Sequence, residues 1–170
     1  MDMFYVAVEL RRNPHLVGKP VVVGGDGSRG VVAAASYEAR RFGVFSAMSS
    51  SQAKRLCPKA IFLPGDHDHY SDVSAEVFQV FNEFTPLVEG LSLDEAFLDV
   101  SDAKIHRGSA TLIAQEIRQR IKDEIGITVS AGIAPNKFLA KVASDWNKPN
   151  GQFVIPPEKV PAFVAQLPVK

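Results

Sequence analysis

This sequence of 170 residues has little cysteine and no formal net charge. Its one cysteine, Cys57, cannot form an intramolecular disulfide, and no Cys/His spacing typical of a zinc site occurs. The chain therefore suits a reducing compartment, and we expect a cytoplasmic protein. The 19 basic and 19 acidic residues cancel to a formal net charge of zero. This balance argues against a nucleic-acid grip spread over the whole surface, although it is compatible with a local basic patch.

Long hydrophobic runs are lacking as well. No apolar stretch approaches the roughly 20 residues of a membrane span, and the first residues lack the basic and then apolar order of a signal peptide. We therefore expect no membrane partner. The composition, with 46% hydrophobic and 22% charged residues, is that of an ordinary globular protein. A chain of this length can bury one core and carry a small appended subdomain.

Strand-like and helical patterns alternate along the chain. The predicted strands are six short β-branched or aromatic runs: 3–8, 20–24, 31–35, 60–63, 91–100 and 128–134. Helical patterns cover 71–84 and 109–125, and a further helix begins at Pro135 and ends before Pro149. In the clearest helix, isoleucine recurs every four residues from Ile113 to Ile125, and Gly126 ends it.

Hairpin-like strand pairs among these helices favour an α+β fold, with helices on one face of a mainly antiparallel sheet. A glycine-rich turn at 24–30 joins two of the short strands. Together with the short helices that follow, this hairpin predicts a subdomain over residues 10–75. The glycines are not a phosphate-binding P-loop, because no Gly-Lys-Ser/Thr follows them.

Two adjacent carboxylates, Asp94 and Glu95, lie inside the apolar run 91–100. Ionised carboxylates among apolar residues are costly unless a charged group meets them. The apolar phase changes from odd to even positions at this point, which indicates a turn or bulge that lets the two side chains converge. Convergent carboxylates suit Mg²⁺, which takes one or two of them plus substrate phosphates. The alternative is a polar hairpin turn with both carboxylates in water.

Two further segments carry groups that bind phosphate. Tyr37 and Arg40 lie three residues apart in a short helix capped by Ser36, so the phenol and the guanidinium share a face. Near one stripe of a later helix lie three lysines: Lys137, Lys141 and Lys148. Each segment has a simpler interpretation, an arginine paired with a carboxylate or a solvated lysine face. Combined with a Mg²⁺ site, however, the two segments describe a nucleoside-triphosphate site.

Two aromatic residues and the cysteine complete the candidates. Phe4 and Tyr5 are expected in a strand, where adjacent side chains face opposite ways. Core packing is the default interpretation of both rings, and one of them can line a site. Cys57, between Leu56 and Pro58, is predicted to be buried rather than catalytic.

With these residues assembled, the chain resembles Y-family translesion DNA polymerases over essentially its whole length. The matching segments are 1–9, 30–48, 85–100 and 134–154, and the most specific of their motifs are SLDEAF at 92–97, AKVASD at 140–145 and KPNG at 148–151. The resemblance implies a polymerase palm formed by residues 1–9 and 76–170. It also implies a small fingers subdomain formed by residues 10–75.

The resemblance implies an activity and its partners. The activity is template-directed addition of a deoxynucleotide to a primer 3′ end, with bypass of damaged template bases. The thumb and the little finger, which hold much of the primer–template DNA, are expected to lie outside this chain. Family segments that bind a sliding clamp are expected beyond Lys170.

The resemblance also implies roles for individual residues. Metal binding falls to Asp94, Glu95 and the main-chain carbonyl of Met1, with two Mg²⁺ ions expected in an intact family site. The positions that contact the triphosphate of the incoming dNTP match Tyr37, Arg40 and Lys148. Tyr5 matches the steric gate, an aromatic ring that excludes a ribose 2′-hydroxyl.

One departure from the family affects the metal site. The family has an Asp immediately before the residue that matches Met1, and this third carboxylate is absent from the sequence. Asp2 lies two strand rises from that position, roughly 6–7 Å, and cannot replace it without rebuilding the site. Because the thumb and little finger are missing as well, we expect little or no processive synthesis from the isolated chain. The alternatives are a non-catalytic module that binds nucleotide or a partner, and a palm-like nucleotide cyclase. The gate residue Tyr5 argues against a cyclase, because cyclases use ribonucleotides.

Overall fold

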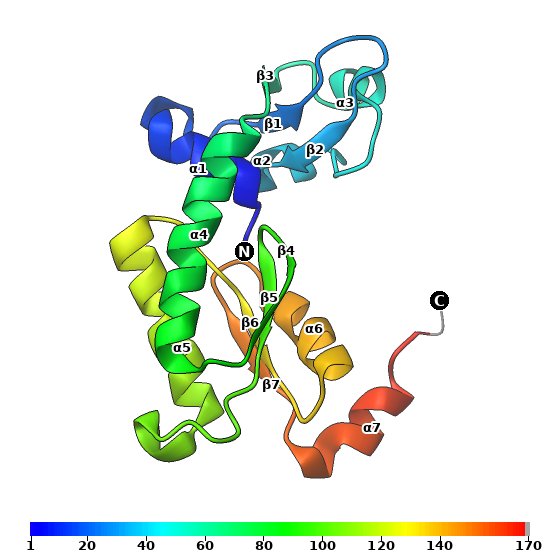
Figure 1. Ribbon diagram of the computed structural model, residues 1–170. Coiled ribbons are helices and arrows are strands. Elements are labelled where there is room, and N and C mark those ends of the chain that lie inside the picture. The colour runs from blue at the N-terminus through cyan, green and yellow to red at the C-terminus, as the bar shows by residue number, and fades with distance from the viewer. Residues whose placement is uncertain (169–170) are drawn as a thin grey trace. The chain divides into compact units, whose positions relative to one another are not determined.

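The computed structural model describes residues 1–168, and residues 169–170, the end of the segment predicted as palm, lie outside them. Helices and short strands alternate along the chain (Figure 1), and the α+β prediction is confirmed. The chain divides into two compact units. One is Met3–Ala75, and the other combines Met1–Asp2 with the described residues from Glu76 onward. No helix within residues 1–168 is both long enough and apolar enough to cross a bilayer.

The unit Met3–Ala75 contains a three-stranded sheet in the order β2-β1-β3. Strands β1 (Val21–Gly24), β2 (Val32–Ala35) and β3 (Ile61–Leu63) coincide with three of the predicted runs. β1 pairs antiparallel with β2, which is the predicted hairpin, and parallel with β3. The core of this unit consists of small and β-branched side chains: Val22, Val32, Ala35, Ala39, Val44, Ala53 and Cys57. The predicted burial of Cys57 is confirmed.

Serine side chains cap the short helices of this unit. The hydroxyl of Ser36 accepts hydrogen bonds from the N–H groups of Val21 (2.9 Å) and Ala39 (3.2 Å). It therefore caps α2 (Tyr37–Arg40), as predicted, and ties that helix to β1. Ser49 caps α3 (Ser50–Leu56) in the same way.

The first segment of the unit is a helix, α1 (Phe4–Arg12), so the predicted strand at 3–8 is wrong. Asn13 closes the last turn, because its backbone N–H (2.9 Å) and its side-chain amide (3.1 Å) both donate to the carbonyl oxygen of Glu9. An apolar run of six residues cannot distinguish a buried strand from a buried helix by its periodicity. The stop signal of Asn13 followed by Pro14, which begins the short helix η1 (Pro14–Leu16), is what marks a helix end.

Long helices dominate the second unit. α4 (His67–Phe84) begins four residues before the predicted helix and continues across the boundary between the units. α5 (Ala110–Arg120) follows its N-cap Ser109 and continues as a π-helical turn, η3 (Ile121–Ile125). Gly126 ends this turn in the left-handed conformation (φ 80°), as predicted. The isoleucines that defined the pattern are all buried: Ile113, Ile117, Ile121 and Ile125.

Two strand pairs accompany these helices. β4 (Val88–Ser92) and β5 (Glu95–Leu98) form an antiparallel hairpin, and its turn, Leu93-Asp94, lies at the predicted phase change. β6 (Ala131–Ile133) pairs in parallel with β7 (Gln152–Val154), and it is shorter than the run predicted at this place. The short helices are η2 (Ile105–Gly108), η4 (Pro157–Lys159) and α7 (Val160–Ala165).

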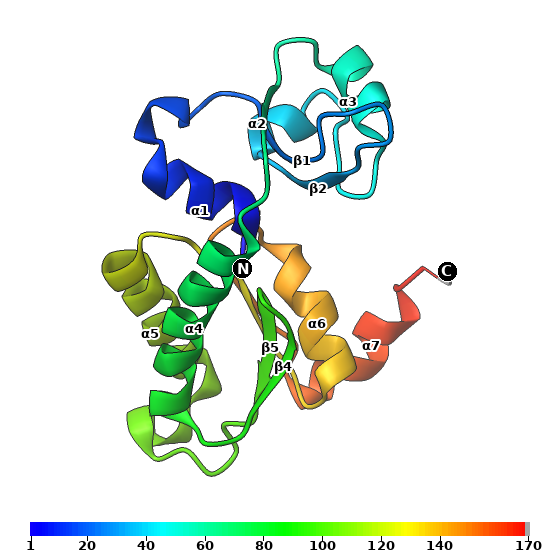
Figure 2. The same ribbon diagram turned by 45° about the horizontal axis from the view of Figure 1, so that its top comes forward.

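Helix α6 (Lys137–Trp146) packs directly on β6. Figure 2 shows α6 beside the β4–β5 hairpin. The side chain of Asn136 caps it by accepting from the N–H of Leu139 at 2.9 Å, so the helix begins two residues after Pro135 and not at it. Buried Leu139, Ala143 and Ile155 form the core on this side of the helix, with the rings of Phe153 and Phe163 packed against them.

Gly132→Ala is expected to lower the free energy of unfolding by about 3 kcal/mol, the upper end of the usual overpacking cost. A Cβ at Gly132 would overlap the carbonyl oxygen of Ala140 and lie 2.5 Å from the amide nitrogen of Ser144, and main-chain atoms cannot rotate away. Gly27→Ala is the control, because a Cβ there meets no heavy atom within 4 Å. Urea unfolding measures both variants. A loss for Gly132→Ala no larger than the loss for the control would contradict this packing.

Candidate functional site

The two adjacent carboxylates lie at the tip of the β4–β5 hairpin. Asp94 belongs to the turn, where its Oδ1 accepts a hydrogen bond from the hydroxyl of Ser92 at 2.8 Å. Glu95 is the first residue of β5 and forms an ion pair of 2.7 Å with Lys141 of α6. Both carboxylates border one cavity of about 460 Å³, which Met1, Lys141 and Lys148 also line. The hairpin tip thus presents two carboxylates to a single cavity.

The main chain of Met1 meets the same place. Its amine donates a hydrogen bond to the backbone carbonyl oxygen of Asp94 at 2.5 Å. Burial lowers the pKa of this amine; the negative charge of Asp94 opposes the shift, and the positive charge of Lys148 adds to it. Met1, Asp94, Glu95 and Lys148 all line the same cavity in one unit.

The lysines do not form one stripe. Lys148 lies beyond the end of α6, where it pairs with Asp145 at 2.7 Å, so its predicted place on the helical stripe is wrong. Lys137 and Lys141 remain on the helix and pair with Glu89 and Glu95 of the hairpin. The lysine face of α6 is therefore neutralised largely by hairpin carboxylates, while Lys148 borders the cavity from a separate segment.

Asp2 has a role that the sequence did not reveal. Its carboxylate is buried and accepts three hydrogen bonds: from the Thr128 hydroxyl (2.7 Å), the Ser130 hydroxyl (2.8 Å) and the Asn150 N–H (2.8 Å). It thereby anchors the segment that carries Lys148. The available signal was the alternation of Thr128 and Ser130, which places two hydroxyls on one side of an extended segment.

Three predicted site residues belong to the unit Met3–Ala75. Arg40 lies with its guanidinium 4.5 Å from the ring centre of Tyr37, so the two side chains share a face as the spacing predicts. The Nε of Arg40 donates to the carbonyl oxygen of Ala35 at 3.0 Å, which uses one of its five N–H donors. Tyr5, on α1, stacks on the ring of Tyr70 at 4.6 Å. Phe4, the residue before Tyr5, is buried. The two rings are separated by the geometry of a helix and not by that of the predicted strand.

The donor set at the hairpin tip consists of hard oxygens. Within residues 1–168, no three or more side chains of His, Cys, Asp or Glu are grouped to hold a metal ion. Asp94 and Glu95 supply two carboxylates to the cavity that Met1 also lines. Such a set fits Mg²⁺ if phosphate oxygens and water complete the coordination.

Comparison with known proteins identifies relatives over the whole chain. The family model described as impB/mucB/samB matches residues 1–145. The DNA polymerase IV of Ralstonia nicotianae is 56% identical over 170 residues, covering 99% of this chain and 48% of the relative. The DNA polymerase IV of Alkalilimnicola ehrlichii is 62% identical, with the same two shares covered. The chain therefore spans about half the length of the curated relatives it matches.

Solved structures give the same result. An insertion ternary complex of Dbh DNA polymerase matches with a TM-score of 0.91 and 38% identity, covering 99% of this chain and 50% of that chain. A Y-family DNA polymerase chimera of Dbh and Dpo4 matches with a TM-score of 0.91 and 37% identity, again over 99% of this chain and 50% of the other. Because each match covers 99% of this chain, the similarity in fold includes both units.

Asp2→Ala is expected to lower the free energy of unfolding by about 3 kcal/mol, since it leaves buried hydrogen-bond donors without an acceptor. The expected loss follows from the three hydrogen bonds that the carboxylate accepts. Exposed Asp72 on α4 provides the control Asp72→Ala, for which a change within about 0.5 kcal/mol is expected. Urea unfolding monitored by circular dichroism compares them. Equal stability of the two variants would rule out the anchoring role.

Proposed function

The chain belongs to the impB/mucB/samB family, its resemblance to Y-family DNA polymerases is confirmed, and we propose that it forms the palm and fingers of a translesion DNA polymerase. The unit that contains Asp94 and Glu95 would be the palm, and most of Met3–Ala75 would be the fingers. The observation that carries the proposal is the grouping of two carboxylates and Lys148 around one cavity. This grouping of charges suits a nucleoside triphosphate with its metal ion.

On the palm side, the proposed roles follow from charge. Asp94 and Glu95, with the carbonyl of Met1, would hold Mg²⁺. When bound there, the metal would supply positive charge that lowers the barrier to phosphoryl transfer. Lys148 would contact the triphosphate as a point charge, and its pairing with Asp145 holds it beside the cavity until a nucleotide arrives.

In the unit Met3–Ala75, the proposed roles follow from hydrogen-bond donors and from the shape of a ring. The other N–H donors of Arg40 suit phosphate oxygens, with Tyr37 beside them as a hydroxyl donor. The ring of Tyr5 would pack against the C2′ atom of the deoxyribose and leave no room for a further oxygen. The substrate would then be a dNTP and not an rNTP.

The partners and setting of the proposed activity are those of translesion synthesis. The relatives named DNA polymerase IV and the Dbh ternary complex support a primer–template DNA and a nucleotide as substrates. We propose synthesis past damaged bases in the cytoplasm, as part of DNA repair. A sliding clamp would be reached through family segments that are not part of this sequence.

A second candidate is a nucleotide-binding module without catalysis. The observation that favours it is that, within residues 1–168, Asp94 and Glu95 are not grouped with a third side chain of His, Cys, Asp or Glu that could hold a metal ion. Such a module would bind dNTP and Mg²⁺ weakly and transfer nothing.

Primer extension tests the proposed activity. The chain is extended by an Asp before Met1 and, after Lys170, by the thumb and little finger of the Ralstonia nicotianae relative. This extended protein is expected to add dNTPs, and Asp94→Ala is expected to reduce the rate at least about 100-fold through lost charge stabilisation. The control is Asp102→Ala, which removes an exposed carboxylate outside the cavity. Full activity of the Asp94→Ala variant would refute the assigned role.

Calorimetry on the 170-residue chain tests the nucleotide pocket that both candidates require. If the nucleotide pocket is retained, dNTP with Mg²⁺ binds, and Lys148→Ala and Arg40→Ala each weaken binding by roughly tenfold, as expected for lost charge-assisted contacts. Lys122→Ala, which removes an exposed lysine, serves as the control. Binding that these two variants leave unchanged would contradict their proposed contacts with the triphosphate.

A further inference from the structure

The ring of Tyr5 is held by other aromatic rings. It stacks on Tyr70 of α4 with the ring centres 4.6 Å apart and the planes 19° apart. His67, one turn earlier on α4, meets the Tyr5 ring edge-on at 5.7 Å. Tyr70 is fully buried, whereas Tyr5 keeps part of its surface exposed. The exposed ring therefore rests on a buried one, and its position depends on where Tyr70 lies.

Tyr70 is in turn held at its hydroxyl. The hydroxyl donates a hydrogen bond of 2.7 Å to Oε1 of Glu9, which lies on α1 one turn after Tyr5. Burial, together with this hydrogen bond, raises the pKa of Tyr70 and keeps the phenol protonated as a donor. The carboxylate of Glu9 is itself buried, so it needs a positively charged partner.

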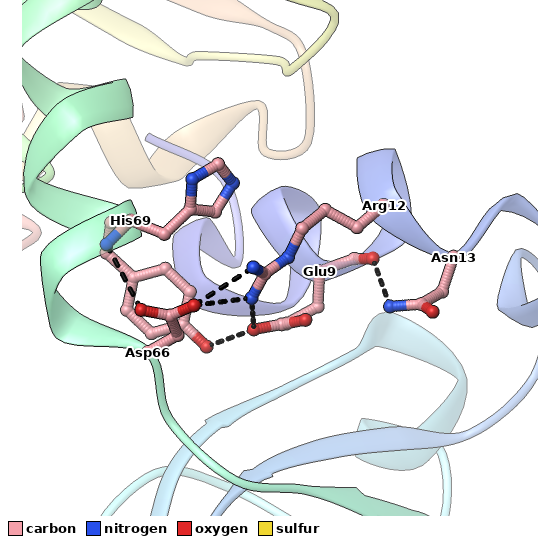
Figure 3. Close-up of polar contacts among 6 residues, drawn as sticks. Glu9, Arg12, Asn13, Asp66 and His69 are labelled. Atoms are coloured by element: carbon pink, nitrogen blue, oxygen red, sulfur yellow. Dashed lines mark hydrogen bonds and ion pairs between the residues drawn. The ribbon is translucent and has the colours of Figure 1, made fainter.

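Arg12 is that partner, and it connects two helices. Figure 3 shows its guanidinium between Glu9 and Asp66, with Nη2 3.1 Å from Glu9 and both Nη atoms 2.9 Å from Oδ2 of Asp66. Asp66 precedes α4, and its Oδ1 accepts a hydrogen bond from the N–H of His69 at 3.2 Å. One arginine thus ties the last turn of α1 to the first turn of α4, the two helices that carry the stacked rings.

The contribution of this arrangement is geometric. Arg12 and Asp66 are each about two-fifths exposed, and ion pairs with that much solvent add little to stability. Their shared contact nevertheless fixes the carboxylate of Glu9, which fixes the hydroxyl of Tyr70. A gate that distinguishes a hydrogen from a hydroxyl needs its ring held closely, because displacements of about 1 Å change rates strongly.

On the basis of the function proposed above, we propose that Glu9, Arg12 and Asp66 form an ion-pair bracket that positions the ring of Tyr5 through Tyr70 and so sets the selection against ribonucleotides. Arg12 and Asp66 are positioning residues in this proposal, since they act through Glu9 and Tyr70. Loss of the bracket should loosen the ring without unfolding the unit.

The first test uses the 170-residue chain and needs no activity. With isotopically labelled tyrosine, NMR measures the ring-to-ring contact between Tyr5 and Tyr70. Arg12→Gln is expected to weaken that contact and shift both sets of ring signals, while the unfolding midpoint stays close to that of the parent. The control, Arg55→Gln, removes an exposed arginine from α3 and should leave the ring signals unchanged. Unchanged ring signals in the Arg12→Gln variant would overturn the proposal.

The second test measures ribose selection in the extended protein described above. Arg12→Gln is expected to raise the rNTP-to-dNTP ratio of insertion efficiencies by roughly tenfold, and Tyr70→Leu, which removes the stack, by more. Arg55→Gln should leave the ratio at the parent value. Tyr70→Phe, which keeps the stack but removes the hydroxyl, should give an effect that does not add to that of Arg12→Gln, because both act through Glu9.

The outcomes separate this inference from the function on which it rests. An extended protein that inserts dNTPs, with a ratio unaffected by Arg12→Gln, would overturn the bracket and leave the polymerase assignment intact. An extended protein that inserts no dNTP would refute the polymerase assignment and ribose selection with it. In that case the NMR contact alone decides whether the bracket positions Tyr5.

Discussion

The buried carboxylate of Asp2 is the interaction on which the candidate palm site depends. It accepts hydrogen bonds from Thr128 and Ser130, which precede β6 in the chain, and from Asn150, which follows Lys148 by two residues. A buried carboxylate with three donors is stable where it lies, and displacing it would leave those donors without an acceptor. Because Met1 and Lys148 adjoin two of the segments it joins, Asp2 fixes the place of both. The proposed metal ligand and the proposed phosphate contact therefore share one structural support.

The charges at and near the cavity are arranged in pairs. Glu95 pairs with Lys141, Glu89 with Lys137, and Lys148 with Asp145. These pairs are partly exposed, so each one adds little to stability and can exchange its partner at small cost. A cation bound by Glu95 would replace an ammonium group, and a phosphate bound by Lys148 would replace a carboxylate. Pairing of this kind keeps both signs of charge beside the cavity in a chain of zero net charge.

The sequence predicts local features well where one segment contains the whole signal. The phase change at Asp94 marks the hairpin turn, and Ser36 caps α2 as its position indicates. Four isoleucines define α5 with its continuation η3, which ends at Gly126. The strand expected at 3–8 is wrong, because six apolar residues suit either a strand or a buried helix. The place of Lys148 on a helical stripe is also wrong, because α6 ends at Trp146.

Long-range contacts account for what the sequence does not reveal. The partners of Asp2 lie 126, 128 and 148 residues away, and the alternation of Thr128 and Ser130 does not point to Asp2. The same holds for Tyr70, which reaches Glu9 across 61 residues. The carboxylates at 94 and 95 could be recognised because they are adjacent in the chain. The residues that support the candidate site could not, because folding alone brings them together.

Gly132 sets the thickness of the layer between β6 and α6. With only a hydrogen atom on this face of the strand, the helix backbone approaches as closely as main-chain atoms allow. A surface without a side chain has no rotamers, so the separation cannot adjust as it does where two flexible side chains meet. The backbone of Lys141, one residue after the contacting carbonyl of Ala140, is consequently held at a nearly constant height above the strand. This backbone contact thereby fixes the point from which the Lys141 side chain extends toward the hairpin.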